Sequence, residues 1–125
     1  MFYKRFLTLL TPLLFIACSS SNDPHEIAMQ LCEYNKEGDI ESIKAYASDK
    51  LKVQLGDLQT MLTMAKKTKE GRDLLKEQEK YMRTINCKES TKVTQSVDGS
   101  FHVVNAKAEL DFKLKMKDGS WKMFK

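Results

Sequence analysis

Histidine, cysteine and long apolar runs are all scarce in this chain of 125 residues. The two histidines, His25 and His102, and the three cysteines match no zinc-type ligand spacing. No serine–histidine–aspartate or cysteine–histidine combination typical of a nucleophilic enzyme is recognisable. We therefore expect no metal, no cofactor and no catalytic residue set of these kinds.

A strong excess of one charge is also missing. The full chain has a formal net charge of +4. Once residues 1–17 are removed, 19 basic and 17 acidic residues remain, and the net charge falls to +2. Basic and acidic residues are interspersed along the chain, and the basic ones form no stripe. We therefore expect no nucleic-acid partner.

The first 18 residues have the order of a bacterial lipoprotein signal. Lys4 and Arg5 precede an apolar run of 11 residues at positions 6–16, and Ala17 stands directly before Cys18. The run is too short for a transmembrane helix, which needs about 20 apolar residues. The sequence therefore predicts a signal peptide over 1–17 and a lipidated Cys18 with a flexible tether over 18–23.

The residues before Cys18 resemble a lipobox, although Phe15 stands where leucine is usual. An ordinary secretory signal is the alternative. Two or more acyl chains would hold the protein stably in a membrane. Because Ser19 rather than aspartate follows the cysteine, we expect the outer membrane, facing the periplasm, with the inner membrane as the alternative.

Cys32 and Cys87 remain as an even pair if Cys18 carries the lipid. The predicted compartment is oxidising, and separate periodicities predict that both side chains point inward. We expect a disulfide between them, with two buried free thiols as the alternative.

The N-terminal half of the domain has helical periodicity. A helix is expected from Asp23 and Pro24 to a stop at Gly38, and Asp39 caps a second, shorter one. A third helix is expected over 51–65, with a break at Gly71, and 73–82 is expected to form a fourth helix or a continuation of the third.

From residue 85 the periodicity changes to that of strands, expected over 85–97, 101–116 and 121–124. Two-residue turns at 98–99 and 118–119 set the register. They place Val93 opposite Val104, and Trp121 opposite Met116. The expected class is α+β, with N-terminal helices packed on a curved, cone-like antiparallel sheet of three or more strands.

The same register places two polar side chains, Glu89 and Thr91, on the concave face of the sheet. The small side chains of Ala108 and Ala106 lie opposite them and leave room for a ligand. Two interpretations stay open: a pocket lined by Glu89 and Thr91, or a β-bulge or register shift that turns Glu89 to solvent.

Phe101 and Val103 fall on the outward face in this register. An exposed apolar pair there marks a contact with a protein partner, or is ordinary scatter of apolar residues over a surface.

Two segments resemble a known group of proteins. Residues 38–48, GDIESIKAYAS, resemble the helix–Gly-Asp–helix–Tyr-x-Ser signature of small bacterial lipoproteins grouped as domain of unknown function 4878, and 117–122, KDGSWK, resemble the last hairpin of that group. The resemblance implies a nuclear-transport-factor-2-like (cystatin-like) domain over 24–125 in the cell envelope. It implies no activity.

We therefore expect an anchored, non-enzymatic binding or accessory module with an envelope protein as its partner. The alternatives are a pocket enzyme of the isomerase or dehydratase kind, with Glu89 as its base, and a carrier of small hydrophobic ligands. The methionines that could line the carrier's pocket are Met61, Met64, Met82 and Met116. The sequence indicates no oligomeric state.

Overall fold

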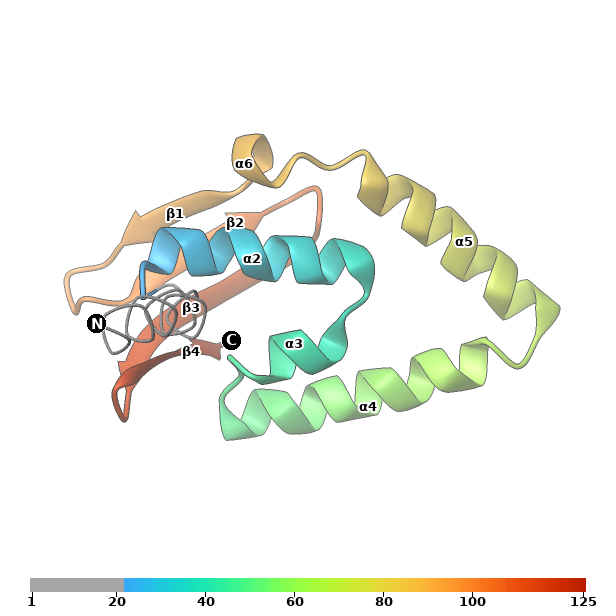
Figure 1. Ribbon diagram of the computed structural model, residues 1–125, viewed down its shortest axis with the longest axis horizontal. Helices are drawn as coiled ribbons and strands as arrows, with labels where there is room; N and C mark the ends of the chain where they lie inside the picture. Colours follow the sequence, from blue (N-terminus) through green and yellow to red (C-terminus); the bar gives the residue numbers. More distant parts are fainter. Residues whose placement is uncertain (1–21) are drawn as a thin grey trace, which may run out of the picture.

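The computed structural model describes residues 22–125 and has an α+β fold, as the sequence predicts (Figure 1). Five helices precede a four-stranded antiparallel sheet in this part of the chain, with strand order β1-β2-β3-β4. The helices are α2 (Pro24–Glu37), α3 (Ile40–Lys44), α4 (Asp49–Ala65), α5 (Lys69–Arg83) and α6 (Cys87–Ser90). The strands are β1 (Lys92–Gln95), β2 (Phe101–Asn105), β3 (Leu110–Lys117) and β4 (Ser120–Phe124).

The ends of α2 and α3 are set by the residues that the sequence indicates. The carboxylate of Asp23 accepts a hydrogen bond from the backbone nitrogen of His25 at 3.0 Å, and Gly38 ends α2 with φ 71°. Asp39 then caps α3 by accepting from the backbone nitrogen of Ser42 at 3.2 Å. Both predicted boundaries are confirmed.

The main core lies between α2 and the inner face of the sheet. One side of α2 and one residue of α3 meet side chains from β2, β3 and β4 there, and burial of this apolar surface stabilises the domain. The buried members of this core are Ile27, Ala28, Leu31, Ile43, Val103, Phe112, Leu114 and Met123.

The hairpin between β3 and β4 has the predicted two-residue turn. Asp118 and Gly119 both have positive φ, 51° and 81°, as a type I′ turn requires. Met116 lies opposite Trp121, as predicted from the sequence.

The hairpin between β1 and β2 differs from the prediction by one residue. Its loop is wider than two residues, with Gly99 at φ 87°, and Val93 pairs with Val103 instead of Val104. The carboxylate of Asp98 accepts hydrogen bonds from the backbone nitrogen and the hydroxyl of Ser100, at 3.0 and 2.6 Å, and so stabilises the wider loop. A shift of one residue exchanges the two faces of a strand.

Two predicted strands are also shorter than expected. The alternating segment 101–116 is divided by a turn over 106–109, in which Glu109 has φ 55°. The segment before β1 forms the short helix α6, which Asn86 caps by accepting from two backbone nitrogens. The strand predictions were too long because apolar residues continue to alternate in the sequence of this turn and of α6, neither of which pairs with a strand.

Helices α4 and α5 form a helical arm, defined here as residues 49–83. The predicted break at Gly71 is wrong, because α5 begins at Lys69 and the hydroxyl of Thr68 caps it. A Cβ atom on Gly71 would lie 2.0 Å from the backbone oxygen of Ala65, so only glycine allows the two helices to approach this closely.

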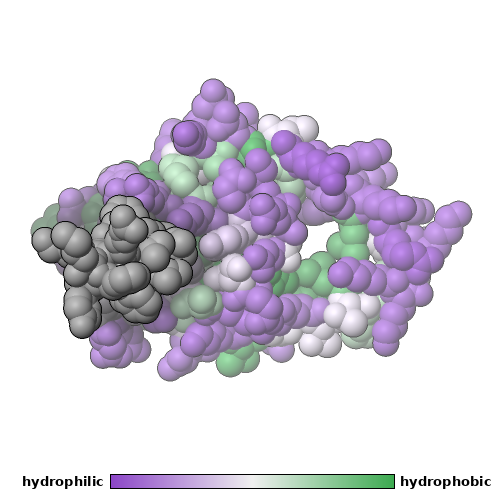
Figure 2. All heavy atoms as spheres, viewed as in Figure 1, coloured by the Kyte–Doolittle hydropathy of each residue, from purple (hydrophilic) through white to green (hydrophobic). Residues whose placement is uncertain are grey.

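The arm extends to one side of the molecule and contacts the rest mainly at its two ends (Figure 1). Leu51 and Leu55 at the start of α4 pack on the main core, and Met82 near the end of α5 packs with Ile85 and Ala108. Between these ends the space-filling view shows an opening that hydrophobic atoms border in part (Figure 2).

Candidate functional site

A hollow of about 440 Å³ lies beside the disulfide, where the end of α5 meets α2 and α6. It is lined by Glu33, Lys36, Arg83, Thr84, Ile85, Asn86, Cys87 and Lys88. Two of its three cationic groups already have partners: Lys36 lies 3.8 Å from Glu33, and Arg83 lies 2.5 Å from Glu79. The hollow is therefore polar, with most of its charge paired.

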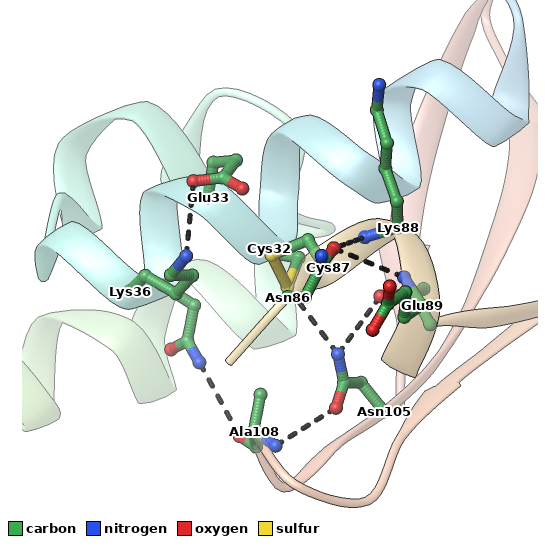
Figure 3. Close-up of a disulfide and its surroundings, with 11 residues drawn as sticks. Cys32, Glu33, Lys36, Asn86, Cys87, Lys88, Glu89, Asn105 and Ala108 are labelled. Carbon is green, nitrogen blue, oxygen red and sulfur yellow. Dashed lines mark hydrogen bonds and ion pairs between the residues drawn. A yellow bond between two sulfur atoms is a disulfide. The ribbon is translucent and has the colours of Figure 1, made fainter. Parts of the chain in front are cut away.

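The disulfide joins Cys32 of α2 to Cys87 of α6, with the two Cα atoms 5.9 Å apart, and confirms the predicted pair (Figure 3). Both residues are buried. Because the sulfur atoms are bonded to each other and shielded from solvent, they supply neither a nucleophile nor a metal ligand. Their role is to hold α6 against α2.

Behind the disulfide lies a buried polar network centred on Asn105, which has no exposed surface (Figure 3). Its amide nitrogen donates to the hydroxyl of Thr91 at 3.0 Å and approaches the sulfur of Cys32 at 3.6 Å. Its carbonyl oxygen accepts from the backbone nitrogen of Ala108 at 3.1 Å. Asn105 therefore ties α2, the end of α6 and the β2–β3 turn together.

Sequence reasoning missed Asn105 because it assigned the residue to the wet face of an unbroken strand. The only local signal is its position just before the stretch Ala106–Ala108. A polar amide there can hold a turn by accepting a backbone hydrogen bond.

The predicted pocket between Glu89 and Thr91 is wrong in its register and in its orientation. Both residues lie at α6 and its end, not in a strand opposite Ala106 and Ala108. Glu89 is exposed and does not line the hollow. Thr91 is buried, and its hydroxyl accepts a hydrogen bond from Asn105. Glu89 is turned to solvent because its segment forms helix α6, and neither a β-bulge nor a shifted strand register applies to it.

The predicted partner surface at Phe101 and Val103 is also wrong. The shifted register turns both side chains inward, so that Val103 is fully buried and Phe101 half-buried. The ring of Phe101 makes edge-to-face contacts with His25 and Trp121, each at 5.5 Å between centroids. These side chains close one end of the core.

The four methionines proposed as pocket liners do not share one cavity. Met82 is buried, but Met61, Met64 and Met116 are exposed. Two of the exposed ones lie on the arm, where large apolar side chains are unusually accessible: Val53 67%, Leu58 42%, Met61 66%, Met64 62%, Leu74 67% and Tyr81 52%. We call these six residues the arm surface.

The start of the arm is docked on α3 by a polar cluster. The side-chain nitrogen of Gln59 donates to Glu41 at 2.8 Å, its oxygen accepts from Lys44, and Lys44 lies 3.6 Å from Glu41. The hydrogen bond from Gln59, assisted by the nearby charge of Lys44, lowers the pKa of Glu41 below its ordinary value.

No group of three or more potential metal-ligating side chains occurs in residues 22–125. His102 is paired with Asp111 on the outer face of the sheet, with 2.7 Å between Nε2 and Oδ1, and this pair is exposed. Within the same residues, no helix is long and apolar enough to cross a membrane.

Cys18, the predicted lipidation site, lies outside the described residues. The chain enters the described fold beside β4, where the indole nitrogen of Trp121 donates to the backbone oxygen of Asn22 at 2.8 Å. Comparisons of the chain with protein-family models, characterised proteins and solved structures find no match. A functional assignment therefore depends on the residues of this chain alone.

Proposed function

We propose that the protein is a lipid-anchored lipoprotein of the bacterial cell envelope, on the periplasmic side of the outer membrane, that binds an envelope protein through its helical arm. In this proposal it has no catalytic activity. The order of basic, apolar and small residues before Cys18 supports the anchor. The resemblance of 38–48 to small envelope lipoproteins supports the location.

The observation that most supports a binding role is the arm surface. Burial of one large apolar side chain is worth about 1.5–3 kcal/mol. Six such residues in one arm have between 42% and 67% of their surface exposed to solvent. The spacing of Val53, Met61 and Met64 places them on one face of α4, and an exposed apolar stripe of this kind typically marks a contact with another protein.

The position of the arm agrees with this role. Its turn at 66–68 lies at the end of the molecule opposite to the site where the chain enters (Figure 1). A protein anchored at Cys18 would present the arm away from its own membrane, toward a partner in the periplasm.

The enzyme alternative has less support. A pocket base needs a carboxyl or imidazole group enclosed beside a substrate site. Glu89 is exposed, and the only carboxylate that lines the described hollow is that of Glu33, which lies beside Lys36.

A photo-cross-linking amino acid placed at Met61 tests the proposal in native envelopes. We expect one adduct of constant mass, which Leu74→Asp on the same arm abolishes. A probe at the exposed Thr94 on the outer face of the sheet is the matched control and should not give that adduct. Absence of an adduct at Met61, or the same adduct from both positions, would contradict the arm as a binding surface.

A further inference from the structure

We propose that the end of the domain at which the chain enters lies against the bilayer, and that the β1–β2 and β3–β4 turns contact its phospholipid headgroups. The inference rests on the lipid anchor proposed above. It concerns a second contact with the same membrane, made by the folded domain itself.

The short tether restricts where this end can go. Asn22 follows Cys18 by four residues, which span at most about 14 Å when fully extended. Trp121 holds the backbone of Asn22 at the start of β4, so the tether leaves the domain from a fixed place. A thioether-linked lipid at Cys18 would therefore keep this end close to the headgroups.

Both hairpin turns lie at this end, beside the start of α2 (Figure 1). Val97 is fully exposed, at 110%, in the loop between β1 and β2, a place where polar residues usually occur. Met116 is 54% exposed at the end of β3 and pairs with Trp121. An exposed valine in one turn, and a methionine that pairs with a half-buried tryptophan beside the other, match the chemistry of the headgroup region, where amphipathic aromatic side chains are favoured.

The charged groups nearby come from all the elements that meet here. Lys113, Lys115 and Lys117 lie on β3, whereas Asp98 and Asp118 lie in the two turns. The start of α2 adds Asp23, Glu26 and His25, of which Asp23 and His25 contact each other, and β4 adds Lys122 opposite Lys115. Because these charges nearly balance, we expect apolar contact to dominate, with the long lysine side chains reaching toward lipid phosphates.

The lipidated full-length protein provides its own probe, because Trp121 is its single tryptophan. The protein is reconstituted in vesicles of phosphatidylethanolamine and phosphatidylglycerol that contain lipids brominated near the headgroup. Flotation measures anchoring, and quenching of tryptophan fluorescence measures contact between this end and the bilayer. We expect strong quenching that Val97→Asp reduces at least twofold without changing flotation.

Ala106→Asp, which adds the same charge to an exposed alanine in the turn between β2 and β3 at the other end of the sheet, is the control and should leave quenching unchanged. Equal quenching in the wild type and Val97→Asp, or a floating protein with unquenched Trp121, would overturn the bilayer contact while leaving the anchor intact. A wild-type protein that does not float would show that the anchor is wrong, and the inference would fail with it.

Discussion

The amide of Asn105 and the hydroxyl of Thr91 form a hydrogen bond of 3.0 Å between two buried side chains. The bond joins the last residue of β2 to the end of α6. Every fully buried polar side-chain atom in the described part of the chain has such a partner. A buried amide that loses its partner keeps the full cost of its desolvation.

Thr91→Val should therefore destabilise the protein, because it replaces the hydroxyl with a methyl group of similar size beside Asn105. We expect a loss of about 1–2 kcal/mol in the free energy of unfolding, measured by urea denaturation. Thr94→Val makes the same change at an exposed position of β1 and should alter stability little. Equal effects of the two substitutions would contradict the role of the hydrogen bond.

Loss of the disulfide should have a larger effect. Cys32 and Cys87 are separated by 55 positions, and a cross-link over such a loop stabilises the folded state by about 4 kcal/mol in the chain-entropy model. We expect a reducing agent to lower the unfolding midpoint of the wild type, and to have no effect on the double variant Cys32→Ala/Cys87→Ala. An intact mass that corresponds to two free thiols in the mature protein would disprove the bridge.

Two glycines of the arm should respond in opposite directions to alanine. Gly71→Ala places a methyl group against the backbone of Ala65, and we expect a cost of about 1–3 kcal/mol. A Cβ atom on Gly56 would meet nothing within 4 Å beyond its own stretch of helix, so Gly56→Ala should stabilise α4 by about 0.5–1 kcal/mol. Thermal unfolding followed by circular dichroism measures both changes, and a stabilising Gly71→Ala would show that the helices do not meet this closely.

The docking of the arm on α3 should weaken in acid. The pKa of Glu41 is lowered in the folded state, so its contribution to stability is fully present above the ordinary value of 4.5 and is lost as the pH falls through the lowered one. Gln59→Met removes the hydrogen bond that lowers the pKa most and should return the carboxyl titration, followed by NMR, toward its ordinary value. Gln54→Met on the same helix is the control, and an unchanged titration in Gln59→Met would contradict this cause.

Lipidation of Cys18 is the prediction on which the proposed location depends. Cys18→Ala should block processing of the precursor or release the protein from membranes. Intact-mass measurement of the membrane fraction should show a chain that begins at Cys18 and has the added mass of its acyl groups. A free thiol at Cys18 in that fraction would refute the prediction.

Local chemistry predicts the helical half of the fold well. The cap at Asp23 and the left-handed stop at Gly38 depend on neighbouring residues only, and their signals are visible in the sequence. The hairpin at Asp118 and Gly119 is equally local, and its register follows from the turn alone. The cysteine pair was predicted correctly, although one of its two arguments was wrong: helical periodicity points Cys32 inward, but Cys87 reaches the bridge from helix α6 and not from a strand.

The first hairpin and the candidate site were not predictable in the same way. A choice between a two-residue loop and a wider one depends on hydrogen bonds between Asp98 and Ser100, which alternation does not encode. The burial of Asn105 depends on contacts with residues 14 and 73 positions away. The exposure of the arm surface could not be predicted, because apolar residues at helical spacing usually face a core. Only the tertiary structure shows that Met61 and Met64 do not.

The bond between Cys32 and Cys87 closes the chain into a covalent ring that includes the whole arm. A single cut by a protease at any peptide bond within that ring would leave one connected molecule, with both new ends still tied to the sheet. The exposed arm can thus be nicked without being shed.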